Sequence, residues 1–239
     1  MQASLKKTLL TQACAPYRKT GISNYQWARG KLKHDPAFEG LLDHALLPDN
    51  ARVLDLGCGR GLLASWFLAA ERLNHEGRWT DASRPPSGLS FRGVELVAPE
   101  VDCGMAALTP LYGDRVKLEA GVMRQAETAG TDVVVILDVL HYVPYADQDC
   151  VLDKIRATLG SGGVFITRIG DAKAGLRFRI RQIVDRFASF VQGHRLSRMW
   201  CRTLPEWVQA LESRGFVVQT LPMSAGTPFA NVMIVSRVP

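Results

Sequence analysis

Four residues at alternate positions, Asp55, Gly57, Gly59 and Gly61, carry the strongest chemical signal in the sequence. They stand directly after an apolar run and before an amphipathic segment. Glycines permit a tight turn and let backbone amides approach a ligand without Cβ atoms in the way. The start of the following helix adds unpaired N–H groups. The pattern predicts a ligand-binding turn, and its spacing differs from the Gly-x-Gly-x-x-Gly of dinucleotide binders. The alternative interpretation is a tight turn without a ligand.

Residues that can exchange a proton or accept a hydrogen bond follow two other apolar runs. Glu95 closes one run, while Asp138, His141 and Tyr142 follow the longest aliphatic run of the chain. Ligands of parallel sheets bind at the carboxyl ends of the strands, where these residues are expected. His141 titrates near neutrality and is a candidate general base, although a structural role is an equally open interpretation. Asp138 is expected to shape the pocket rather than act as a base.

The elements that position these residues follow from an alternation of short apolar runs and amphipathic segments. Strands are expected at residues 52–56, 91–96, 115–119, 132–137, 164–168, 216–221 and 231–236. Helices are expected over residues 35–46, 62–70, from 99, over 151–159 and over 203–215. A polar loop is expected at 71–90. This alternation predicts a doubly wound α/β fold with a largely parallel sheet.

The segment Val-Leu-Asp-Leu-Gly-Cys-Gly-Arg-Gly at residues 53–61 resembles the first motif of class I S-adenosylmethionine (SAM)-dependent methyltransferases. Gly93-Val94-Glu95, residues 132–143, residues 159–166 and the paired closing strands resemble further parts of the same family. The similarity covers roughly residues 48–170 and the C-terminus. It implies a Rossmann-like seven-stranded sheet, mostly parallel with an antiparallel C-terminal strand, within an α/β/α sandwich.

This resemblance implies SAM as the cofactor, S-adenosylhomocysteine (SAH) as the product, and no metal. By position, Asp55 is expected to bind the methionine ammonium and Glu95 the ribose hydroxyls. Asp81 is an alternative ribose ligand, but the Ser-Arg-Pro-Pro sequence just after it does not suit the end of a strand. The remaining cofactor contacts are expected from Gly57, Cys58, Gly59, Gly61, Leu96, Val122, Met123 and Asp138.

One departure from the family concerns the adenine. After the third strand the family often carries an acidic or amide residue near the adenine amino group, and residues 120–123, Ala-Gly-Val-Met, offer none. Backbone groups near Val122 and Met123 are therefore expected to serve, with the Met123 thioether as a surface for the ring or as core filling.

Aromatic and cationic side chains precede the predicted core. Tyr25, Trp27 and Arg29 are expected to face the substrate cleft, with ordinary core contacts as the alternative. They belong to an N-terminal helical segment, residues 1–47, that is predicted to act as a lid. The methyltransferase domain then spans residues 48–239 and carries a helical cap insertion at about 171–202.

The net charge of +6 is localised. Nine basic and two acidic residues lie between Arg168 and Arg202, so this segment holds the whole excess. Apolar residues recur through it at helical spacing, which predicts an amphipathic helix with arginines on its other faces. These arginines, Arg177 among them, are expected to meet an acidic group of the substrate or an acidic carrier. A solvated helix face is the alternative.

Composition narrows the class of protein. Of the 239 residues, 47% are hydrophobic and 22% are charged, which is typical of a globular chain. The longest aliphatic run is far shorter than the ~20 residues of a membrane span, and no signal-peptide core is present. A cytoplasmic protein is expected. Five scattered cysteines without a Cys-x-x-Cys pair indicate neither a disulfide framework nor a zinc site.

The sequence therefore predicts a SAM-dependent methyltransferase. The expected acceptor is a small or acyl-carrier-bound molecule, with transfer to oxygen favoured and His141 and Tyr142 as catalytic candidates. Alignment of reactants alone supplies effective molarities of ~10⁵ M or more, so few catalytic residues are needed. An RNA methyltransferase is the first alternative, because basic surface also neutralises phosphates. A non-catalytic cofactor-binding protein of the same fold is the second. The oligomeric state is not predicted.

Overall fold

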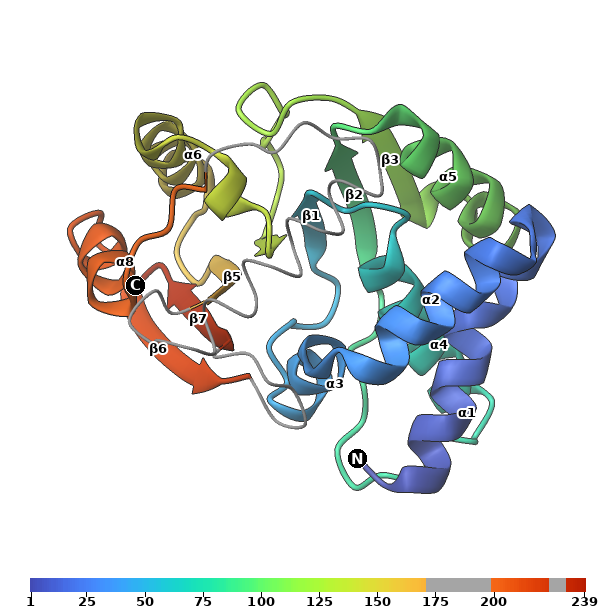
Figure 1. The fold of residues 1–239 in the computed structure, drawn as a ribbon. Coiled ribbons are helices and arrows are strands. Elements are labelled where there is room, and N and C mark those ends of the chain that lie inside the picture. Colours follow the sequence, from blue (N-terminus) through green and yellow to red (C-terminus); the bar gives the residue numbers. More distant parts are fainter. Residues whose placement is uncertain (171–198, 224–230) are drawn as a thin grey trace. The chain divides into compact units, whose positions relative to one another are not determined.

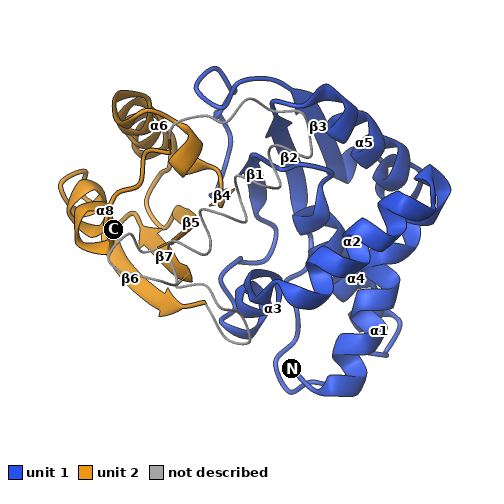
Figure 2. Cartoon of the chain, in the orientation of Figure 1, with its two compact units in different colours: residues 1–135 blue, residues 136–239 orange. Residues whose placement is uncertain are grey.

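The computed structural model describes residues 1–170, 199–223 and 231–239. Arg177 and most of the expected cap lie outside the described residues. The chain forms two compact units, Met1–Val135 and Ile136–Pro239 (Figure 2).

Seven strands form one sheet in the order β3-β2-β1-β4-β5-β7-β6. They are β1 (Arg52–Leu56), β2 (Ser90–Glu95), β3 (Val116–Ala120), β4 (Val133–Leu137), β5 (Val164–Gly170), β6 (Val217–Pro222) and β7 (Asn231–Arg237). β1 runs parallel to β2 and β4, and β2 runs parallel to β3. β7 runs antiparallel to both β5 and β6. The predicted fold class is confirmed, and no strand boundary differs by more than two residues.

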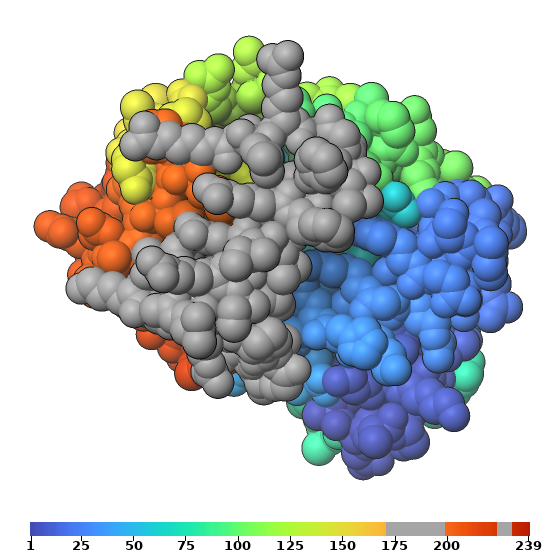
Figure 3. Space-filling model, viewed as in Figure 1, coloured from blue at the N-terminus to red at the C-terminus, as the bar shows by residue number. Residues whose placement is uncertain are grey.

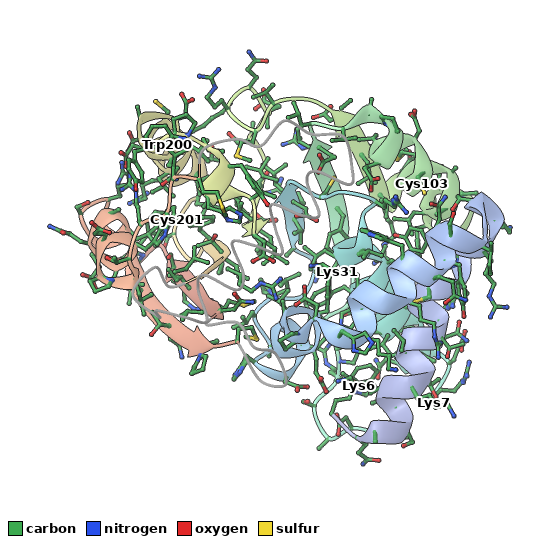
Figure 4. The ribbon with its side chains drawn as sticks, in the orientation of Figure 1. Lys6, Lys7, Lys31, Cys103, Trp200 and Cys201 are labelled. Carbon is green, nitrogen blue, oxygen red and sulfur yellow. The ribbon has the colours of Figure 1, made fainter. Side chains whose placement is uncertain are left out.

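In the first unit, helices precede and alternate with strands β1 to β3. They are α1 (Ala3–Cys14), η1 (Ala15–Thr20), α2 (Ile22–His34), α3 (Pro36–Asp43), α4 (Leu62–His75), α5 (Ala98–Tyr112) and η2 (Gly113–Arg115). α1 packs on α4, and η1 packs on both α2 and α5 (Figure 1). Lys6 and Lys7 lie on α1 and Lys31 on α2 (Figure 4), and the solvent side of these helices is open to view in Figure 3. The N-terminal helices are thus an integral layer of this unit.

Helix α4 continues five residues beyond its predicted end and shortens the expected loop at 71–90. The buried Glu71 side chain explains why the helix is longer than predicted. The Glu71 carboxylate accepts a hydrogen bond from the Gly88 amide (2.8 Å) and pairs with Arg115. Burial of a charge requires such partners, so the polar residues after Ala70 that suggest a loop instead belong to the helix.

The second unit holds η3 (Leu140–Tyr142), α6 (Tyr145–Thr158) and α8 (Leu204–Glu212) with strands β5 to β7. The predicted capping box is present, since Thr203 and Glu206 hydrogen-bond to each other's backbone amides. α6 begins six residues earlier than its apolar pattern predicts, directly after Pro144. None of the helices within the described ranges has the length and hydropathy required to cross a membrane.

Candidate active site

The glycine turn after β1 is built as the sequence predicts, but its glycines serve different purposes. Gly59 and Gly61 both have left-handed backbones, with φ of 52° and 74°. A Cβ on Gly61 would lie 2.9 Å from Leu108 and 3.0 Å from Leu118, so Gly61 permits close contact with α5 and β3. A Cβ on Gly59 would meet no atom within 4 Å. The backbone at Gly59 therefore borders open space, as a ligand-facing turn requires.

Asp55, the last-but-one residue of β1, has a buried carboxylate. Its exposed fraction is 7%, and no hydrogen bond to its side chain is found within the described part of the chain. Burial, followed by the nearby charge of Glu95, raises the pKa of Asp55 to about 7. A buried carboxylate without a donor is unfavourable in itself. It is suited to a cationic ligand group that supplies both a charge and N–H donors.

Glu95 holds the turn from the adjacent strand. Its two carboxylate oxygens accept hydrogen bonds from the amides of Gly59 and Val97, each at 3.0 Å. A carboxylate offers about four lone-pair sites, so two remain for hydroxyl groups of a ligand. The geometry thus joins the Gly59 turn to an acceptor that suits a diol, the role expected for Glu95 from the sequence.

Exposed apolar side chains lie close to Glu95. Leu96 directly follows β2 and is 72% exposed, and Val122 follows β3 and is also exposed. The Gly121 amide donates to the Glu95 carbonyl (2.9 Å), which links the two strand ends. Met123 is half-buried. Exposed apolar groups around polar ones are typical of a ligand surface, here suited to a flat aromatic base.

Cys58 does not face that surface. Its side chain is buried, and its Sγ would lie 2.6 Å from a Cβ built on Gly93. Burial raises the pKa of the Cys58 thiol, followed by the charges of Asp55 and Glu95. Cys58 is thus an unreactive thiol that packs against β2, and any contact with a ligand would come from its backbone.

The three N-terminal candidates are placed in different surroundings. Tyr25 is buried, and its hydroxyl accepts a hydrogen bond from Arg18 (3.2 Å). Trp27 lies on the surface with the Arg60 guanidinium 4.3 Å from its ring centroid. Arg29 is half-buried. Tyr25 and Trp27 thus contact side chains of their own unit, and their contact with a substrate stays a prediction.

In the second unit, Asp138 is held by Arg168, which is predicted only as one cation of the basic segment. Arg168 is buried, and its Nε donates to the Asp138 carboxylate at 3.0 Å, with a second contact through Nη2. Asp138 also has a left-handed backbone with φ of 61°, and its amide donates to the Arg168 carbonyl. The ion pair fixes the chain as it leaves β4, which agrees with the pocket-shaping role expected for Asp138.

His141 and Tyr142 form the short η3 turn, with ring centroids 4.1 Å apart. The His141 carbonyl accepts a hydrogen bond from the Trp200 amide (2.8 Å). A pocket in this unit is lined by Leu140, His141, Arg168, Ile169, Gly170, Met199, Trp200, Cys201, Arg202 and Trp207. Trp200 and Cys201 are labelled in Figure 4. The pocket is small, about 20 Å³, which is room for about one water molecule, and its walls combine apolar and aromatic side chains with an imidazole.

Gln148 of α6 links the segments that line this pocket, and it is not among the site residues predicted from the sequence. The fully buried Gln148 amide nitrogen donates to the carbonyls of Leu140, Val143 and Trp200 at 2.8–3.0 Å. Its side-chain oxygen accepts from Arg202 (3.0 Å). Gln148 therefore ties the η3 turn to the segment that begins at Met199. A buried glutamine leaves no signal in one sequence, because its partners are distant backbone groups.

Cation ligands do not gather in the described residues, where no group of three His, Cys, Asp or Glu side chains has the arrangement of a metal site.

Comparisons with known proteins identify the family and the fold. Residues 27–221 match the methyltransferase domain family. No curated protein sequence matches the chain. Among solved structures, the SAH-bound magnesium protoporphyrin IX methyltransferase of Synechocystis PCC 6803 superposes with a TM-score of 0.60 at 16% identity, over 90% of this chain and 87% of that one.

Two longer enzymes show the same fold. The mitomycin 7-O-methyltransferase has a TM-score of 0.60 at 20% identity, over 89% of this chain and 56% of its own. An O-methyltransferase of neocarzinostatin biosynthesis, in complex with SAM and 2-hydroxy-5-methyl naphthoic acid, has a TM-score of 0.59 at 19% identity, over 90% and 56%. At these identities the likeness concerns the fold, while the family match spans most of the sequence. This chain belongs to the methyltransferase domain family.

Proposed function

We propose that this protein is a SAM-dependent methyltransferase that transfers a methyl group to an oxygen atom of a small or carrier-bound organic acceptor. The observation that carries the cofactor assignment is the buried Asp55 carboxylate, which has no donor among the described residues and lies at the end of β1, before the open backbone of Gly59. An ammonium group provides the charge and the donors that this carboxylate lacks.

The residues of the first unit fit the parts of SAM. Asp55 would hold the ammonium, Glu95 the ribose hydroxyls, and Leu96 and Val122 the adenine. When bound, SAM supplies an electrophilic methyl group and a neutral thioether as the leaving group. The protein's own contribution is to align the partners and to exclude water from them.

The acceptor is assigned to the surface beside the η3 turn of the second unit. The exposed Tyr142 ring and Trp200 lie next to His141 and offer aromatic surfaces to a ring. A hydroxyl acceptor must lose a proton during transfer, which an imidazole can take, whereas a neutral amine attacks through its lone pair and loses a proton only after the methyl group has moved. The two O-methyltransferases among the structural relatives support the same preference.

Replacement of His141 by alanine tests this role. We expect turnover on a hydroxylated aromatic acid to fall by about 10²–10⁴-fold, because a general base contributes that much. SAH affinity should remain within about twofold, because a base of this kind binds no part of the cofactor. The measurement is initial rate with methyl-labelled SAM, alongside calorimetry with SAH. A larger loss of SAH affinity than of turnover would instead make His141 a pocket residue.

The same methyl-transfer assay distinguishes a small-molecule acceptor from RNA as the acceptor. With hydroxylated aromatic acids and total RNA offered in parallel, label should enter the small molecules. Label in RNA, with an affinity that falls steeply as salt rises, would contradict the proposed acceptor class.

Replacement of Gly59 by leucine tests the cofactor turn. A side chain there would fill the space that borders the turn, so we expect SAH affinity to fall by about tenfold or more. The left-handed backbone adds a strain of about 1–2 kcal/mol, which lowers the melting temperature. Gly77→Leu is the matched control, since Gly77 has φ of 68° and open space around a Cβ but follows the far end of α4. Equal losses of affinity in both variants would contradict the assignment.

A further inference from the structure

Arg60 is the one long side chain within the glycine turn, and its guanidinium is bound on three sides. Nε and Nη2 donate to the two carboxylate oxygens of Glu100 at 2.6 and 2.8 Å. Nη1 donates to the side-chain oxygen of Asn24 at 2.9 Å. The ring of Trp27 covers its face with a centroid distance of 4.3 Å. Partners from α5 and α2 therefore meet on one residue of the turn, in the geometry that arginine alone provides.

The backbone of Arg60 is fixed as well. Its carbonyl accepts a hydrogen bond from the Tyr17 hydroxyl at 2.8 Å. Tyr17 is fully buried, and burial raises the pKa of its hydroxyl well above the usual value, so it remains a donor at every physiological pH. On the other side, α5 approaches so closely that a Cβ on Gly104 would lie 2.7 Å from the same carbonyl.

These contacts join the turn directly to the N-terminal helices of the first unit. Cys103 of α5, labelled in Figure 4, lies next to Gly104 and reaches Thr20 of η1 with a sulfur-to-oxygen distance of 3.5 Å. η1 packs against both α2 and α5, the helices that carry the partners of Arg60. The N-terminal segment is part of the scaffold of the turn.

A turn rich in glycine loses much conformational freedom when a ligand orders it, and that loss weakens binding. A clamp that orders the turn beforehand removes part of the loss. We propose that Arg60 is a positioning residue: through Glu100, Asn24, Trp27 and Tyr17 it holds the glycine turn in its binding conformation, so that η1 and α2 set cofactor affinity from outside the site. This inference rests on the proposed SAM site, and it adds a role for residues that do not themselves contact the cofactor.

The competing interpretation is that Arg60 only attaches α2 to the first unit. Amide hydrogen exchange of the unliganded protein distinguishes the positioning role from this competing interpretation. It is measured for the turn at residues 57–62 and for α2. If Arg60 positions the turn, Arg60→Met accelerates exchange in both segments. If it only attaches α2, exchange rises in α2 alone, and this outcome overturns the proposal. The exchange measurement needs no cofactor, so it also decides the matter if the protein binds no SAH.

Calorimetry with SAH provides the second readout. We expect Arg60→Met to weaken SAH binding by about tenfold, because the turn must now be ordered by the ligand. Glu100→Gln should act in the same direction and covers the case in which Arg60→Met folds poorly. Arg60→Lys should resemble Arg60→Met, because an ammonium reproduces neither the two-pronged pairing nor the stacking. Full rescue by lysine would mean that charge alone matters, and would overturn the positioning role.

The chain offers a matched control. Arg52 makes the same kind of two-pronged pair with Asp132, at 2.9 and 2.8 Å, but at the opposite end of β1. Arg52→Met should change SAH affinity by less than about twofold, since this exposed pair borders no part of the turn. Equal effects of Arg52→Met and Arg60→Met would assign the loss to general stability and overturn the proposal. Absence of SAH binding in the unaltered protein would refute the proposed function instead.

Discussion

Replacement of Asp55 by asparagine is expected to weaken SAH binding by roughly 100-fold while making the unliganded protein more stable. A buried charge that pairs with a ligand ammonium is worth about 3 kcal/mol or more when its partner is present. The asparagine keeps the shape of the side chain and loses the charge. The measurements are calorimetry with SAH and thermal unfolding of the unliganded variant.

The gain in stability follows from the raised pKa of the Asp55 carboxyl group. Burial raises the pKa of Asp55 from its ordinary value of 3.8 to about 7, so the folded state binds this proton more tightly than the unfolded state does. The free energy of unfolding therefore falls as pH rises from about 4 to about 7, and the full penalty is present above pH 7. Asp55→Asn removes that penalty, which predicts a gain of about 1–3 kcal/mol at pH 8 and little gain at pH 4.

Cofactor affinity should depend on the same titration. Below pH 7 the unliganded carboxylate is protonated, so SAH affinity should fall as pH drops, by up to about tenfold per pH unit. The Asp55→Asn variant should lack this slope. If that variant binds SAH as well as the unaltered protein does, or is less stable at pH 8, the role assigned to Asp55 is contradicted.

Replacement of Gly104 by alanine is expected to have the largest effect on the fold. The added Cβ would lie 2.6 Å from Leu118 and 2.7 Å from the Arg60 carbonyl, and the carbonyl is backbone that cannot turn away. Overpacking of this kind costs about 1–3 kcal/mol. It should also displace the glycine turn, so SAH affinity should fall with stability. Thermal unfolding and calorimetry measure the two effects.

Gly30 of α2 is the matched control, since it is a second helical glycine in the same unit with no atom within 4 Å of a Cβ. Gly30→Ala should raise stability by about 0.5–1 kcal/mol, the ordinary preference of a helix for alanine. Both substitutions replace a helical glycine by alanine, and their effects on the free energy of unfolding should have opposite signs. A stabilising Gly104→Ala would show that α5 can move away from the turn, and would contradict the tight contact.

Local patterns account for what can be predicted from the sequence. The strands are predicted from short apolar runs. The turn is predicted from glycines that lie close together in the sequence. The position of Glu95 at the end of β2 is predicted because the end of this apolar run is visible in the sequence. Gly104 carries a weaker signal, because an isolated glycine in a helical pattern often has a packing reason, and here that reason is the backbone of Arg60.

What escapes prediction depends on partners that are distant in sequence. Arg168 resembles one cation of a basic segment, yet it is buried with Asp138. Gln148 acts on backbone carbonyls that no pattern announces. The contact of Trp27 with Arg60 joins distant parts of the chain and is not predicted, while a contact of Trp27 with a substrate stays a prediction. Residue type indicates the chemistry that each side chain can do, and only the fold shows its partner.

Calorimetric titration of the unaltered protein with SAH tests the central claim most directly, because it requires no knowledge of the acceptor. The buried Asp55, the open Gly59 and the Glu95 carboxylate predict binding at one site per chain, with a dissociation constant of about 1–100 μM at pH 8. Absence of binding heat with SAH at about 1 mM, confirmed by an unchanged melting temperature, would contradict the assignment of the cofactor site.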